Sequence, residues 1–382
     1  MKIHSFIKRS TFLIISFLTF NLGVQAQDYY VYVTAESEDE VALVKFDGKK
    51  ASIEKTIPVG IWPAEIEGPH GINISPDGKY WYLSIAHGNP YGTLYKYSTE
   101  SNEVVDTVRL GLFPASLQVS KATGLLYCVN FDLHGDMVPS TVSVVDPEEM
   151  IEIDRIETGV MPHGSRISSD GMFHYSVGMM SGELFEISTT KLKVTRKLSL
   201  DGMEEEKSSM GGMDHSKMDH SKMGHSMMTE SAAPMYHSAT KPTWAIPHPT
   251  NGKVYVAGNG SDEILEVDLD QWEITNRFKT GKAPYNCDVT PDGKYLVATY
   301  KGSGETGIWD LKKGEELPRI KNTRNVTHGV TISSDSKYAF ISVEGIGGEP
   351  GTMDVIDIKN AKKVASVDMG KQAGGIIFWK ME

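Results

Sequence analysis

One segment of the chain carries methionine and histidine at a regular spacing of five residues. The ligand-type side chains in it are Met213, His215, Met218, His220, Met223, His225 and Met227. Thioether sulfur is a soft ligand suited to Cu(I), whereas imidazole binds Cu(II), zinc and nickel as well as Cu(I). Because both ligand types alternate here, the spacing predicts a tract that holds copper through a change of oxidation state. Zinc is a second metal that fits, although methionine would then add little.

The tract lies within residues 201–240, a stretch in which Ser, Lys, Gly and Asp dominate the remaining positions. Such a composition cannot bury a hydrophobic core, so the stretch is predicted to be disordered without metal. The Met-Asp-His-Ser units resemble the repeats of bacterial periplasmic copper-resistance proteins, and this resemblance implies copper sequestration. A low-complexity linker with incidental histidines is the alternative that the sequence leaves open.

A second set of histidines shares a different feature, because each is followed directly by glycine. They are His70, His87, His134, His163 and His328. Glycine permits a tight backbone turn and leaves the preceding imidazole unobstructed. These five residues are far apart in the sequence, so only the fold can bring them together.

The fold is predicted by an internal repeat of strand, tight turn and strand. Its clearest copies span residues 71–82 and 287–297, where Asp-Gly supplies the positive φ that turns between antiparallel strands need. Each copy is followed by two more strands, and four strands at a spacing of roughly forty residues are typical of propeller blades. Seven blade starts are found, at Pro69, Pro114, Pro162, Pro242, Pro284, Thr327 and Ala373.

The last of these repeats is incomplete, because only one strand, at 375–379, precedes the end of the chain. Three N-terminal strands, at 29–34, 41–46 and 51–59, are available to complete it. The sequence therefore predicts an all-β, seven-bladed β-propeller that pairs C-terminal with N-terminal strands, so that no sheet edge is exposed. The Met/His-rich stretch is one loop insertion in this propeller.

Three short motifs carry a resemblance to a known family. Val31-Tyr32-Val33-Thr34, residues 57–60 and residues 75–78 resemble the pattern of the YVTN-type seven-bladed propellers. The resemblance covers the chain from residue 27 onward apart from 201–240. It implies the fold but no particular activity, since such propellers host unrelated functions.

In this propeller all five His-Gly pairs fall on one face. His70, His163 and His328 precede innermost strands and are predicted to point towards the central channel. His87 and His134 lie in loops between second and third strands, on the same face as the insertion. We therefore expect a metal site at the channel mouth, with loop caps or packed channel residues as the alternative. His174 lies within a strand and is expected to be structural.

The arrangement is similar in plan to the copper site of nitrous oxide reductases, but it departs from their pattern. The remaining channel positions are Ala115, Thr243, Tyr285 and Gly374, so a full histidine ring is missing. The C-terminal cupredoxin domain of those enzymes is also missing. The resemblance therefore does not extend to their activity.

The N-terminus predicts export. Lys2, Lys8 and Arg9 precede an apolar run, and small residues before Gln27 suit signal peptidase, so residues 1–26 are predicted to be a signal peptide. An uncleaved anchor is the alternative. The net charge of −12 disfavours nucleic acid as a partner, and no second apolar stretch is long enough to span a membrane. Cys128 and Cys287 are expected to be separate buried thiols rather than a disulfide.

Together these features predict a periplasmic or secreted copper-binding protein that sequesters copper or delivers it to a periplasmic copper-handling or redox protein. Binding is favoured over turnover. One alternative is a lactonase-like hydrolase, for which Glu67, Asp136, Arg166, Glu344 and Glu349 are the charged loop candidates. Another is a protein-interaction platform, which would need no metal.

Overall fold

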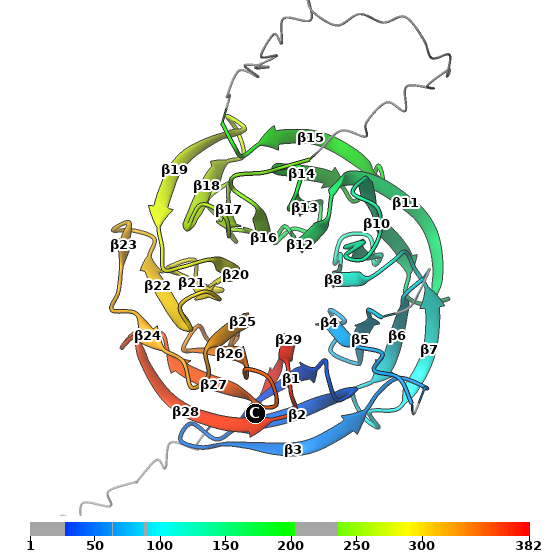
Figure 1. Cartoon of the computed structure of the whole chain (residues 1–382), viewed down its shortest axis with the longest axis vertical. Helices are drawn as coiled ribbons and strands as arrows, with labels where there is room; N and C mark the ends of the chain where they lie inside the picture. Colours follow the sequence, from blue (N-terminus) through cyan, green and yellow to red (C-terminus); the bar gives the residue numbers. More distant parts are fainter. Residues whose placement is uncertain (1–26, 63, 88–90, 203–235) are drawn as a thin grey trace, which may run out of the picture.

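The computed structural model describes residues 27–62, 64–87, 91–202 and 236–382. Within these ranges the chain forms seven antiparallel sheets, arranged as blades around a central channel (Figure 1). The seven-bladed propeller expected from the repeats is therefore confirmed. No helix in these ranges is long and apolar enough to cross a membrane. The predicted signal peptide and the Met/His residues 213–227 lie outside the described residues.

Each blade begins with an inner strand at the channel and ends with an outer strand at the rim. Blades 1 to 4 comprise β29 (Ala373–Met381), β1 (Tyr29–Ala35), β2 (Glu40–Phe46) and β3 (Ala51–Pro58); β4 (Pro69–Ile74), β5 (Tyr80–Ile85), β6 (Thr93–Ser98) and β7 (Val104–Arg109); β8 (Pro114–Val119), β9 (Leu126–Asn130), β10 (Pro139–Asp146) and β11 (Ile151–Val160); and β12 (Pro162–Ile167), β13 (Phe173–Gly178), β14 (Glu183–Ser188) and β15 (Lys193–Ser199).

Blades 5 to 7 follow the same order, except that the outer strand of blade 6 is split in two. They comprise β16 (Pro242–Pro247), β17 (Lys253–Gly258), β18 (Glu263–Asp268) and β19 (Glu273–Lys279); β20 (Pro284–Val289), β21 (Tyr295–Tyr300), β22 (Glu305–Asp310), β23 (Glu315–Glu316) and β24 (Ile320–Lys321); and β25 (Val326–Ile332), β26 (Tyr338–Glu344), β27 (Gly351–Asp357) and β28 (Lys362–Met369).

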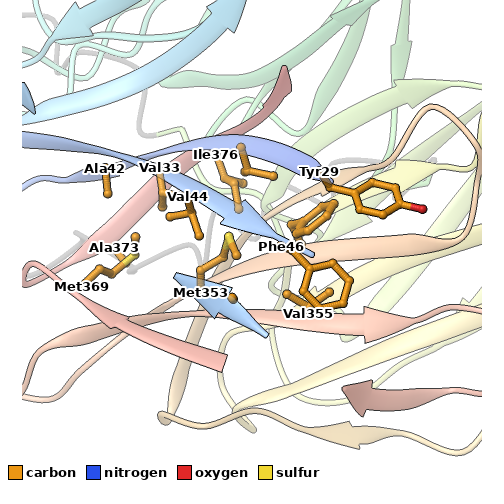
Figure 2. Close-up of a cluster of buried hydrophobic side chains, with 13 residues drawn as sticks. Tyr29, Val33, Ala42, Val44, Phe46, Met353, Val355, Met369, Ala373 and Ile376 are labelled. Atoms are coloured by element: carbon orange, nitrogen blue, oxygen red, sulfur yellow. The ribbon is translucent and has the colours of Figure 1, made fainter. Parts of the chain in front are cut away.

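Blade 1 closes the ring in the way the sequence predicts. The C-terminal strand β29 pairs antiparallel with β1, from Tyr29 opposite Met381 to Ala35 opposite Ala373. Figure 2 shows the buried side chains that fasten this blade to blade 7, where Phe46 and Val44 of β2 face Met353 and Val355 of β27. Burial of these apolar side chains stabilises the closed ring.

The tight turns follow from the Asp-Gly dipeptides. Gly78 and Gly293 have φ values of 72° and 71°, a left-handed conformation that glycine adopts without a steric cost. The preceding Asp77 and Asp292 accept hydrogen bonds from the backbone N–H of Lys79 and Lys294. These hairpins lie at the face opposite the His-Gly pairs.

The glycines at the channel have a packing role. A Cβ on Gly71 would lie 1.9 Å from the carbonyl oxygen of Ala115 in the next blade, and one on Gly164 would lie 2.2 Å from that of Thr243. Inner strands of neighbouring blades thus approach backbone to backbone. The glycine in these His-Gly pairs is required by this close approach, whatever its histidine does.

The two cysteines are separate, as expected. Cys128 lies on β9 and Cys287 on β20, and both are free and buried. Burial raises the pKa of each thiol well above its usual value, so neither is prepared to act as a nucleophile or a metal ligand.

Candidate metal site at the channel mouth

Four aromatic rings meet at the channel mouth, the end of the channel where the inner strands begin. They belong to His70 on β4, His163 on β12, Tyr285 on β20 and His328 on β25. Successive ring centroids are 5.9 Å (His70–His163), 5.2 Å (His163–Tyr285), 4.7 Å (Tyr285–His328) and 6.1 Å (His328–His70) apart. We call this arrangement the four-ring cluster.

Small residues in the two blades next to His70 explain why its ring contacts histidine rings from blades further away. The corresponding positions in blades 3 and 1 are Ala115 and Gly374, which occupy little of the channel. The imidazole of His70 therefore meets His163 across Ala115 and His328 across Gly374. A full histidine ring would not be needed to bring three imidazoles together.

His163 is held in one tautomer by its neighbours. Its Nδ1–H donates to the carbonyl oxygen of Thr243 at 3.0 Å, and its Nε2 accepts from the hydroxyl of Tyr285 at 2.9 Å. Burial, with repulsion from His70, lowers the pKa of His163 to about 3. The imidazole is thus neutral at pH 7, the form that binds metal ions.

His328 is also buried and neutral, but one of its nitrogens has no partner. Burial and the nearby Lys301 hold its pKa well below the usual range. Its Nε2 lies 3.7 Å from Oε1 of Glu344, which Lys301 approaches at 3.1 Å. Among the described residues, nothing forms a hydrogen bond with the buried Nδ1 of His328.

His70 and His87 share the buried carboxylate of Glu36, in the loop after β1. Nδ1–H of His70 donates to Oε2 at 3.1 Å, and Nε2 of His87 lies 3.5 Å from Oε1. Burial alone raises the pKa of Glu36, but attraction to His70 and hydrogen bonds from both histidines outweigh burial and hold it well below the usual range. The hydrogen bond between His87 and Glu36 also raises the pKa of His87. A carboxylate on Nδ1 orients a histidine ring and leaves Nε2 available to a metal ion.

The fifth histidine stands apart from this group. His134 is exposed, in the loop after β9, and its ring centroid lies 6.0 Å from that of Phe113. Phe113 also contacts His70 and His87, at 5.3 Å and 5.8 Å between centroids. His134 therefore borders the channel mouth without reaching the four-ring cluster. His174 is buried within β13, as expected for a structural residue.

The residues of the four-ring cluster fit a metal ion in part. Imidazoles that ligate one ion at about 2 Å per nitrogen have ring centroids roughly 5–6 Å apart. The spacing of His70 from His163 and from His328 is close to this value, whereas Tyr285 lies between the rings of His163 and His328. Yet Tyr285 occupies Nε2 of His163, and no three His, Cys, Asp or Glu side chains in the described ranges are already placed to hold a metal ion. The donor types fit copper or zinc, but binding requires ring rotation and release of Tyr285.

The sequence pattern did not identify two residues of this site, Glu36 and Lys301. Both follow the second strand of their blades, β1 and β21, as His87 and His134 follow β5 and β9. Comparing this loop across all seven blades would have identified them. Glu344 and Arg166, which the hydrolase alternative places in loops, lie in strands instead. Glu344 ends the second strand of blade 7 beside His328, and Arg166 lies within the inner strand β12.

The fold and site together define the class, a seven-bladed β-propeller with imidazoles clustered at its channel mouth. No family model matches the chain, and no curated protein matches its sequence. Among solved structures the chain is similar to hydrazine synthase of Kuenenia stuttgartiensis, with 19% identity and a TM-score of 0.57 over 78% of this chain and 81% of that chain. At this identity the similarity shows the propeller fold alone.

Proposed function

We propose that this is an exported, periplasmic copper-binding protein that sequesters or delivers copper. The copper ligands at the channel mouth would be His70, His163 and His328, with His87 and His134 at its border. The Met/His tract, Met213 to Met227, would capture copper through its thioether and imidazole groups. We also propose that the chain is related to the YVTN-type propellers, on the three motifs that resemble their pattern.

One observation carries the proposal for the channel mouth, the convergence of three imidazoles from three blades. Two of them, His163 and His328, are buried and neutral, so binding would not require a proton to leave them. The Nδ1 atoms of His70 and His163 are tied to acceptors, which is how ligand histidines are usually oriented. The buried, unpartnered Nδ1 of His328 is costly unless something binds it.

Three groups of the chain's own residues would influence a bound copper ion. Glu36 would hold the His70 ring and balance positive charge, since its carboxylate stays ionised. Tyr285 would have to release His163, so its hydroxyl competes with the metal. The phenylalanines Phe113 and Phe131, which contact His70 and His163, would keep water from the site. Copper itself would supply affinity for soft and imidazole ligands alike.

The experiment is a copper titration of the protein from residue 27 onward, with and without the tract. The deletion should remove only 203–235, because Asp201 accepts hydrogen bonds from Ser238 and Thr240 and these contacts join blades 4 and 5. The proposal expects the tract-free protein to keep one copper site. The triple variant His70→Ala, His163→Ala, His328→Ala should lose it.

The matched control is His248→Asn, at a hairpin on the opposite face, where the imidazole caps the N–H groups of Thr250 and Asn251. This variant should bind copper normally. Loss of all binding on deletion of the tract would leave the tract as the only site and refute the channel proposal. If the intact protein binds no copper, the function fails altogether. Lactone hydrolysis by the metal-free protein would instead favour the hydrolase alternative.

A further inference from the structure

A small cavity of about 30 Å³ lies beneath the four-ring cluster inside the channel. His70, His163 and His328 line it at the mouth, and Arg166, Trp244 and Asn286 line it further in. We propose that this cavity binds a small anion, of halide size, between the guanidinium of Arg166 and the indole N–H of Trp244. The proposal does not depend on copper binding.

Arg166 is a channel cation without a close counter-ion. Its Nη1 donates to the carbonyl oxygen of Ser165 at 2.8 Å, and its guanidinium stacks on Trp244 at 4.4 Å. Among the described residues no carboxylate forms an ion pair or hydrogen bond with it, and the charge of Asp288 acts on it only at a distance. Burial lowers the pKa of Arg166 to about 10. A charge withdrawn from water is costly unless it is paired. A guanidinium carries five N–H donors, and within the described residues only Nη1 of Arg166 has an acceptor.

A second arginine in the same molecule shows what is missing. Arg196 stacks on Trp272 at 4.2 Å, much as Arg166 stacks on Trp244. The Arg196 guanidinium, however, also forms an ion pair with the buried carboxylate of Glu186 and donates to the carbonyl oxygen of Leu269. The Arg166–Trp244 pair stacks at a similar distance, but among the described residues Arg166 has no ion pair like that of Arg196, and it lines the cavity instead.

Trp244 provides the second, independent observation. Its Nε1–H is buried and has no hydrogen-bond acceptor among the described residues, and only 7% of the residue is exposed. An indole nitrogen can only donate, so the missing partner must be an acceptor. Asn286, also on the cavity wall, has an unpartnered side-chain oxygen; turning its amide would present NH₂ to the same acceptor.

The size and charge of the cavity restrict the occupant. A volume of about 30 Å³ accommodates one or two waters or one monatomic anion, and it favours an occupant of that size over sulfate. The guanidinium repels cations, so a metal ion inside this cavity is disfavoured. Burial raises the pKa of Asp288 to about 6, although attraction to the charge of Arg166 opposes this shift. Asp288 and Arg166 nevertheless form no ion pair within 4 Å. Ordered water is the competing occupant.

The direct test is a crystal structure of the protein grown in sodium bromide, with diffraction data collected at the bromine absorption edge. We expect an anomalous peak in the cavity, within hydrogen-bonding reach of Arg166 and Trp244. In solution, bromide should raise the melting temperature saturably, beyond the effect of sulfate at equal ionic strength, because a ligand that binds only the native state stabilises it. A cavity that holds water alone, with no anomalous peak, would overturn the proposal.

Two variants and one control separate the site from general salt effects. Arg166→Met should abolish the saturable bromide response, and Trp244→Phe, which keeps the charge and loses one N–H, should weaken bromide affinity by about tenfold or more. Arg196→Met removes a similarly stacked arginine away from the cavity and should leave the bromide response intact. Equal bromide responses in the wild-type protein and in both cavity variants would contradict the assignment, even if copper binding were established.

Discussion

At the scale of single residues, the most informative side chain outside the channel mouth is His174. Both of its ring nitrogens are buried without a hydrogen-bond partner among the described residues, and its ring lies 5.4 Å from that of Tyr127. A neutral imidazole must carry one N–H, so one donor is unsatisfied in a largely apolar environment. Nothing else in the described structure assigns this residue a function.

We therefore expect His174→Leu to stabilise the protein. Removing a buried unsatisfied polar group of similar volume should raise the free energy of unfolding by about 1–3 kcal/mol, measured by urea denaturation at pH 7. His163→Leu, which breaks two hydrogen bonds instead, should destabilise and serves as the comparison. A clear loss of stability in His174→Leu would mean that the imidazole has a partner.

The buried histidines also predict how stability depends on pH. Burial lowers the pKa of His163 and of His174 to about 3, whereas in the unfolded chain each titrates near about 6.5. Between these two pKa values the unfolded state binds more protons than the folded state. The contribution of these histidines to the free energy of unfolding is therefore fully present above about pH 6.5, and it decreases as the pH falls. Each histidine adds up to about 1.4 kcal/mol per pH unit to this slope.

Urea denaturation at pH 7, 6 and 5 measures that slope. Glu36, whose pKa is held low in the folded state, acts in the same direction at more acidic pH. His174→Leu should reduce the slope by roughly one proton. A free energy of unfolding that does not change between pH 7 and pH 5 would show that these imidazoles are not buried as described.

At the scale of strands, the close approach of neighbouring inner strands can be tested directly by mutation. We expect Gly71→Ala to destabilise the protein by at least about 1–3 kcal/mol, because its Cβ would overlap the carbonyl oxygen of Ala115. The control is Gly348→Ala, where an added Cβ has open space. Thermal unfolding of both variants measures the difference, and equal melting temperatures would contradict backbone contact at the channel.

This scale also shows why the strands were predictable and the site only in part. Asp-Gly turns and apolar strands are local features, so the hairpins at Asp77 and Asp292 were readable from the sequence. The meeting of His70 with His163 depends on Ala115 being small, and the role of Glu36 depends on a loop that closes onto another blade. Such contacts between distant segments are not encoded in any local pattern.

At the scale of the whole molecule, the ring depends on one C-terminal strand. Deleting residues 373–382 removes β29, leaves β1 without its partner on the channel side and opens the cluster around Phe46. We expect this truncated protein to lose cooperative unfolding and to aggregate, since a free sheet edge is exposed. Deleting the longer segment 203–235 should leave a cooperative transition, as followed by circular dichroism. A cooperatively folded truncation would argue against closure through blade 1.

The propeller also explains how separate chemistries share one channel. The inner strands carry the four-ring cluster at the mouth and Arg166 with Trp244 beneath it, so a proposed metal site and a proposed anion site lie along one axis. The seven blade starts were identifiable from the repeats, and so was the face that collects the His-Gly pairs. The missing partners of His328, Trp244 and Arg166 became visible only once burial was known.

The central claim, that imidazoles of the channel mouth bind copper, is tested most directly by locating the metal. The tract-free protein, loaded with one equivalent of copper, should be crystallised and measured at the copper absorption edge. We expect one anomalous peak within about 2 Å of ring nitrogens of His70, His163 and His328, with the Tyr285 hydroxyl moved away from His163. A peak elsewhere, or no peak with the Tyr285–His163 hydrogen bond intact, would contradict the proposed site.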